Sequence, residues 1–65
     1  MDELIKALDK VGYSRIPSMT LTTIICNVMQ DAQYSPDVYA TYNILGKYEK
    51  QYGHLTVEDL RKLTK

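Results

Sequence analysis

The sequence predicts an all-α fold in which residues 1–65 form a single, compact bundle of four helices. The expected helices cover residues 2–11, 20–33, 36–52 and 57–64, and the third is the longest. Apolar residues recur at spacings of three and four in each segment, which is the period of a helix with one buried side. Residue types that begin or end helices stand between the segments. A chain of 65 residues has room for one small core.

The first segment places its apolar residues on one side of a helix: Leu4, Ile5, Leu8 and Val11. Acidic residues at its start and Lys10 near its end complement the helix dipole. Gly12 suits the left-handed backbone that commonly ends a helix, and Leu8 is then expected to contact Tyr13.

The second segment contains the stretch "TLTTIICNVM", whose β-branched residues favour strands. Its apolar residues nevertheless follow helical spacing: Leu21, Ile24, Ile25, Val28, Met29 and Ala32. A strand requires alternation, which adjacent pairs such as Ile24 and Ile25 interrupt. We therefore expect a helix with this stripe buried. Ser18 or Thr20 caps it, because Pro17 keeps the residue before it out of the helical region.

The third segment begins with the clearest boundary, Ser35 as N-cap and Pro36 at the first helical position. Tyr34 and Tyr39 are expected to pack together as a hydrophobic staple across this boundary. One broad side of the helix is expected to face the core, with Val38, Thr41, Tyr42, Ile44, Leu45, Tyr48 and Tyr52. Gly46 marks a close helix approach, a bend or an exposed weak point.

The fourth segment follows Gly53 and opens with a capping box of Thr56 and Asp59. Leu55 and Leu60 form a second expected staple. The stripe expected to be buried consists of Val57, Leu60 and Leu63, while Glu58 and Lys62 are spaced to pair on the outside.

The charge balance and the cysteine content limit the location and the partners. Eight basic and eight acidic residues give a net charge of zero, which argues against strong non-specific attraction to nucleic acid or anionic membranes. No stretch has the length of a membrane-spanning helix. The acidic start does not resemble a signal peptide, and one cysteine cannot form an internal disulfide. We therefore expect a cytoplasmic protein that does not interact with membranes.

Residue sets for catalysis or metal binding are nearly absent, so we expect no enzyme, metal, cofactor or small-molecule substrate. Cys26 and His54 are the only nucleophile and base to consider. Cys26 lies in the least charged part of the chain and is expected to be a small buried hydrophobe. One cysteine and one histidine are too few for a zinc site, and the carboxylates do not fit a calcium loop.

The leading functional hypothesis is a small non-enzymatic regulator or adaptor that binds a protein, either a second copy or a larger partner. Residues 16–30 carry no charge, and tyrosine, the only aromatic type present, suits half-covered surfaces. Both observations suggest that more than one side of the second helix is covered. The expected partner-binding residues are Thr20, Thr23, Asn27, Gln30, Tyr34 and Tyr39. A central helix surrounded by the chain's own helices is the competing explanation.

The alternative hypothesis is a helix-turn-helix-like, DNA-binding transcriptional regulator. The polar side of the third helix carries residue types that contact phosphates and base edges, namely Asn43, Lys47, Lys50 and Gln51. Such a helix would enter the major groove. The long connection before Val38 and the balanced charge argue against this alternative.

Overall fold

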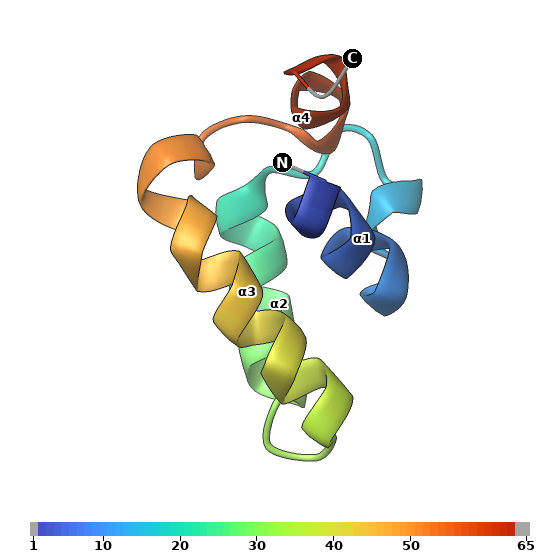
Figure 1. Cartoon of the computed structure of the whole chain (residues 1–65), viewed down its shortest axis with the longest axis vertical. Coiled ribbons are helices and arrows are strands. Elements are labelled where there is room, and N and C mark those ends of the chain that lie inside the picture. Colours follow the sequence, from blue (N-terminus) through green and yellow to red (C-terminus); the bar gives the residue numbers. More distant parts are fainter. Residues whose placement is uncertain (1, 64–65) are drawn as a thin grey trace.

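The computed structural model describes residues 2–63 and shows the predicted all-α architecture of four helices (Figure 1). The helices are α1 (Asp2–Val11), α2 (Leu21–Asp31), α3 (Pro36–Tyr52) and α4 (Val57–Leu63), and a short 3-10 helix, η1 (Tyr13–Arg15), follows α1. The prediction for the second helix, residues 20–33, was too long at both ends. The predicted last residue of the fourth helix, residue 64, lies outside the described residues.

Local signals account for the ends of the first two helices. Gly12 has a positive φ of 85°, so the left-handed turn predicted after α1 is present. Thr20 is the N-cap of α2: its backbone is extended and its Oγ1 accepts a hydrogen bond of 3.3 Å from the backbone N–H of Thr23. An N-cap residue is not itself helical, and α2 therefore begins at Leu21.

The turn between α2 and α3 explains why α2 ends early. Ser35 is extended before Pro36, and its Oγ accepts from the backbone N–H of Val38 at 3.5 Å. The chain must reverse its direction before this cap, and the N–H of Tyr34 donates to the carbonyl of Asp31 at 2.9 Å within the turn. Residues 32–34 are consequently used for the reversal rather than for a last helical turn.

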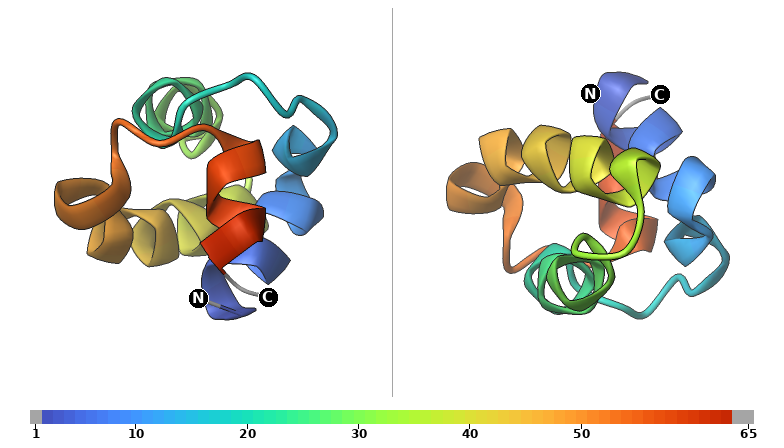
Figure 2. Two further views of the ribbon diagram at one scale, coloured as in Figure 1. Left: turned by 90° about the horizontal axis from the view of Figure 1, so that it is seen from above. Right: turned by 90° about the horizontal axis from the view of Figure 1, so that it is seen from below.

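The first half of the chain, α1 and α2, contacts the second half, α3 and α4, both through the helices and through the two connections. α2 and α3 run side by side in opposite directions, α1 lies beside α3, and α4 lies across the end of the molecule near the start of α1 (Figures 1 and 2). The connections at residues 12–20 and 53–56 also lie side by side, and Thr20 and Thr56 form an isolated antiparallel bridge. α1 and α4 are joined at their surfaces by Asp9 and Arg61, whose charged groups are 3.3 Å apart.

The connection at residues 53–56 accepts hydrogen bonds from the start of α2, and the connection at residues 12–20 accepts hydrogen bonds from the start of α4. The N–H groups of Leu21 and Thr22 in α2 donate to the carbonyls of Leu55 and Gly53, both at 3.0 Å. In return, the N–H groups of Val57 and Glu58 in α4 donate to the carbonyls of Met19 and Pro17, also at 3.0 Å. The first N–H groups of a helix have no partner inside the helix, so these four bonds replace hydrogen bonds to water.

The core draws on all four helices and comprises Leu4, Ala7, Leu8, Leu21, Ile24, Ile25, Val28, Leu45, Val57 and Leu60. Thr41 is the buried polar residue among those described, and its hydroxyl donates to the carbonyl of Asp37 at 3.0 Å. The predicted capping box is present, because the Asp59 carboxylate accepts from the N–H of Thr56 and the Thr56 hydroxyl from the N–H of Asp59. The predicted pair of Glu58 and Lys62 also forms, at 3.7 Å.

Four predictions about burial were wrong. Met29 is 49 % exposed and Leu63 is 54 % exposed, and Cys26 is exposed as well. Tyr34 is 84 % exposed, so it does not form the predicted staple with Tyr39, which is itself 56 % exposed. The helices that pack on α2 cover Leu21 and Val28 but leave Met29 and Cys26 exposed to solvent. Tyr34 belongs to the turn at the end of the hairpin farthest from α4 (Figure 1).

α3 continues without interruption through Gly46, which is exposed, and a Cβ placed on this residue would have no atom within 4 Å. We expect Gly46→Ala to increase the free energy of unfolding by about 1 kcal/mol, because alanine is the better residue in a helix interior. Urea denaturation followed by circular dichroism measures this change. Gly12→Ala is the matched control and should be destabilising, since its φ is positive. A loss of stability in Gly46→Ala would contradict the open surroundings of this residue.

Candidate interaction surface

The exposed residues of α2 carry no charge from Thr22 to Gln30, and Asp31, the last residue of the helix, is turned toward Lys10 and Tyr13. Leu21, Ile24, Ile25 and Val28 are buried on the side that faces the core. The exposed residues between Thr20 and Asp31 are Thr22, Thr23, Cys26, Met29 and Gln30, while Thr20 and Asn27 are partly buried. A helix at a protein surface ordinarily turns charged residues toward water. The chain's own helices therefore cover one side of α2 and leave an uncharged side open.

The edge of this open side lies next to α3. Thr22 identifies the edge, because its hydroxyl donates to the carbonyl of Gly53, just past the end of α3, at 2.6 Å. Cys26 and Met29 follow Thr22 at i+4 and i+7, so they lie on the same edge of the helix.

The part of α3 that lies beside α2 also has an exposed apolar residue, Tyr39. Ala40 and Ile44 line a groove against α1, and Tyr39 and Gly46 therefore lie on the side of α3 that is turned away from α1. The exposed large hydrophobic residues of the described chain are Ile16, Met29, Tyr34, Tyr39 and Leu63, and three of these five belong to the α2–α3 hairpin. The apolar surface left uncovered is thus concentrated on this hairpin.

We use the name hairpin surface for eight exposed, uncharged residues of α2, of the turn after it and of the start of α3. Its members are Thr22, Thr23, Cys26, Met29, Gln30, Gln33, Tyr34 and Tyr39. The charged residues of the hairpin end, Asp31 and Asp37, lie elsewhere, around a cavity of about 300 Å³ that Lys10 and Tyr13 also line. The hairpin surface is therefore kept free of nearby acidic groups at this end.

The six predicted partner-binding residues differ in their exposure to solvent. Thr23, Gln30, Tyr34 and Tyr39 are exposed members of the hairpin surface. Thr20 and Asn27 are partly buried, and Thr20 already has a structural role as the cap of α2. Sequence reasoning missed the exposure of Cys26 and Met29 because both were assigned to a buried environment. The spacing of Thr22, Cys26 and Met29 along one edge was the signal that was available.

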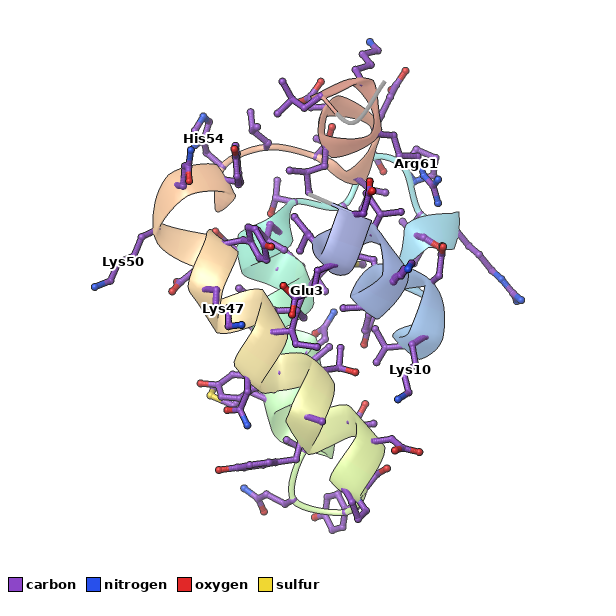
Figure 3. All side chains as sticks on the ribbon, viewed as in Figure 1. Glu3, Lys10, Lys47, Lys50, His54 and Arg61 are labelled. Carbon is purple, nitrogen blue, oxygen red and sulfur yellow. The ribbon has the colours of Figure 1, made fainter. Side chains whose placement is uncertain are left out.

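The predicted nucleic-acid-binding residues, Asn43, Lys47, Lys50 and Gln51, are all exposed on α3. Lys47 points toward Glu3, and its Nζ lies 3.7 Å from Glu3 Oε1, whereas Lys50 points away from the protein (Figure 3). α2 and α3 run in opposite directions and are joined by the turn at residues 32–35 (Figure 1). DNA binding through these four residues stays a prediction.

Glu3 joins α1 to α3 through two contacts. Besides Lys47, it accepts a hydrogen bond of 3.3 Å from the hydroxyl of Tyr48, whose ring stacks on Tyr52 at 6.4 Å between centroids. Desolvation of the hydroxyl, together with the negative charge of Glu3, raises the pKa of Tyr48 above its ordinary value. Tyr48 therefore remains a neutral hydrogen-bond donor at neutral pH.

The described residues offer few groups for chemistry. Between residues 2 and 63, no three His, Cys, Asp or Glu side chains come together in a way that suits a metal ion. Cys26 lies on the exposed side of α2, and His54 is exposed in the connection after α3. None of the helices in this part of the chain combines the length and the apolar character that crossing a membrane requires.

Comparisons with known proteins found no match. No protein-family model fits the chain, and no curated protein or solved structure is similar to it. Functional inference consequently depends on the surfaces of this chain alone.

Proposed function

We propose that this protein is a small non-enzymatic regulator or adaptor that acts through protein binding and forms a homodimer through the hairpin surface. The observation that carries the proposal is the exposed side of α2, which has no charged residue from Thr20 to Gln30. Exposed apolar residues that gather on one part of a surface are typical of interaction sites. Met29, Tyr34 and Tyr39 supply such residues, and methionine and tyrosine are enriched in interfaces.

A second copy of the chain is the partner that fits this surface best. In a two-fold dimer the same surface of both copies meets itself, so any charge on it would face a like charge nearby. The exposed residues of α2 from Thr22 to Gln30 are uncharged, so a contact between two α2 helices avoids this repulsion. The net charge of zero also removes long-range repulsion between copies.

The area that a stable dimer needs implies that α3 takes part. An interface of standard size buries about 800 Å² on each partner, roughly a fifth of the 4284 Å² surface of this protein. α2 has 11 residues and is therefore about 16 Å long, which is too short to supply that area from one side. Tyr34 and Tyr39 extend the contact, so the proposed dimer pairs two α2–α3 hairpins.

The dimer is tested with two exposed residues of the hairpin. We expect Met29→Glu to weaken dimerisation at least tenfold, because it places two carboxylates at the proposed contact. Asn43→Glu adds the same charge on the polar side of α3, outside the hairpin surface, and should leave dimerisation unchanged. Sedimentation velocity on wild-type protein and both variants measures the association, and circular dichroism verifies that each is folded.

Two results would overturn the homodimer. The first is a wild-type protein that sediments as a 7.5 kDa monomer at concentrations of tens of micromolar, the range in which a weak specific dimer assembles. The second is a dimer that Asn43→Glu disrupts as strongly as Met29→Glu, since the contact would then lie on the polar side of α3.

A further inference from the structure

A groove runs between α1 and α3 on the side of α3 turned away from the hairpin surface. Its volume is about 370 Å³, and its floor consists of Ala7, Ala40, Thr41 and Ile44. Ion pairs join the two helices at its two ends, Glu3 with Lys47 at 3.7 Å and Lys10 with Asp37 at 3.8 Å. The groove is therefore bounded by charged side chains at both ends, and Figure 3 labels Glu3, Lys47 and Lys10 among them.

The floor of the groove is apolar. Ala7 and Ala40 have the smallest side chains that present a methyl group, and the space between the two helices stays open because they do not fill it. The hydroxyl of Thr41 donates to the carbonyl of Asp37, so it is already occupied within α3. A ligand on this floor consequently meets mainly methyl and methylene groups, which favour a hydrocarbon.

Lys6 is the charged residue of the groove that has no partner. It lies on α1 between Glu3 and Lys10, one turn from each, and no ion pair forms between it and any residue described by the structure. The residues of α3 that line the groove are Ala40, Thr41 and Ile44, none of which is acidic. The ammonium group of Lys6 is thus an unneutralised positive charge beside an apolar floor.

We propose that this groove binds a small monocarboxylate with an aliphatic body, whose carboxylate pairs with Lys6 and whose chain lies on the floor. The rim supports an anion, because three lysines, Lys6, Lys10 and Lys47, face two carboxylates, Glu3 and Asp37, and leave one net positive charge. The volume is at the lower end of the range of about 300–1,000 Å³ found for small-molecule sites. This binding does not depend on the homodimer, since the groove and the hairpin surface lie on different sides of α3.

Affinity is expected to be modest, because the groove is open to solvent and the ligand is small. A dissociation constant on the order of 1 mM corresponds to a ligand of about ten heavy atoms at ordinary ligand efficiency. Sodium octanoate is the probe, and its binding is followed by the amide chemical shifts of ¹⁵N-labelled full-length protein. We expect saturable shifts at Ala7, Ala40 and Ile44, and at least tenfold weaker binding of acetate and of octylammonium.

Two variants test the assigned contacts. Lys6→Gln should weaken octanoate binding at least fivefold, and Lys50→Gln, which removes another exposed lysine, outside the groove, should not change it. Ala40→Leu places a larger side chain over the floor and should abolish the shifts at Ala7, while its spectrum verifies the fold. The proposal is overturned if octanoate gives no saturable shifts at roughly ten times the expected dissociation constant. It is also overturned if octylammonium binds as well as octanoate, or if Lys6→Gln binds like the wild type.

Discussion

Leu45→Ala is expected to leave a large fraction of the protein unfolded at room temperature. Leu45 is fully buried near the middle of α3, where it belongs to the same core cluster as residues of α1, α2 and α4. Replacing a buried leucine with alanine costs about 2–5 kcal/mol, from lost burial and from the cavity that remains. A single core in a domain of this size supplies only about 3–5 kcal/mol of net stability. The loss therefore approaches the whole stability of the fold.

Leu63→Ala is the matched control for this prediction. It makes the same chemical change on α4, at a leucine that is 54 % exposed. We expect the free energy of unfolding to fall by no more than about 1 kcal/mol, because less than half of the Leu63 side chain is covered by the rest of the protein. Urea denaturation of the two variants measures the difference. An equal loss of unfolding free energy in Leu45→Ala and Leu63→Ala would contradict the exposure of Leu63.

The helix ends could be predicted from the sequence because their causes are local. Gly12, Thr20, Ser35 and the capping box at Thr56 each act on backbone groups within three or four residues, and the structure has all four in these roles. The helix predicted for "TLTTIICNVM" is also confirmed, and Leu21, Ile24, Ile25 and Val28 of its predicted apolar stripe are buried. The β-branched composition was a weaker influence than the apolar period.

Exposure at the edges of a helix could not be predicted in the same way. Met29 follows the apolar stripe of α2, but its burial depends on how far α3 covers that edge, and no neighbouring residue in the sequence determines this. The open floor of the α1–α3 groove has a similar origin, since Lys6 lacks a partner because Ala40 and Ile44 lie opposite α1. Helical period identifies the centre of a buried side, and tertiary packing determines its width.

The pairing of the two connections is the least local feature of the fold. Thr20 and Thr56 are 36 positions apart in the sequence and nevertheless form one antiparallel bridge. Thr56 was correctly predicted as a cap and Thr20 was one of the two residues predicted to cap α2, but a cap gives no information about a distant partner. The four backbone bonds around this bridge join the start of α2 to the start of α4. This contact holds α4 against the start of α2.

Gly53 is the residue on which this junction depends most closely, and Gly53→Ala is expected to destabilise the protein by about 1–3 kcal/mol. It is buried, and its carbonyl accepts from both the N–H and the hydroxyl of Thr22. A Cβ at this position would lie 2.6 Å from the carbonyl oxygen of Glu49 and 2.7 Å from Thr22 Oγ1. Both distances are too short for a carbon atom, and one of the two neighbours is backbone. The φ of −54° is ordinary, so crowding rather than backbone strain is the cause.

A double-mutant cycle with Thr22→Ala separates the two close contacts. Thr22→Ala alone should cost about 1 kcal/mol, from the lost hydrogen bond to Gly53. In that background the crowding by Oγ1 is absent, so Gly53→Ala should cost less than it does in the wild type, by about 0.5–1 kcal/mol. The remaining cost comes from Glu49 in the last turn of α3. Chemical denaturation of the four proteins measures both terms, and Gly46→Ala, which is expected to be stabilising, shows that alanine itself is not harmful on this helix. If the two substitutions have strictly additive effects on the free energy of unfolding, Gly53 is required for a reason other than its contact with Thr22. If Gly53→Ala does not change stability, the close contacts of Gly53 with Glu49 and Thr22 are contradicted.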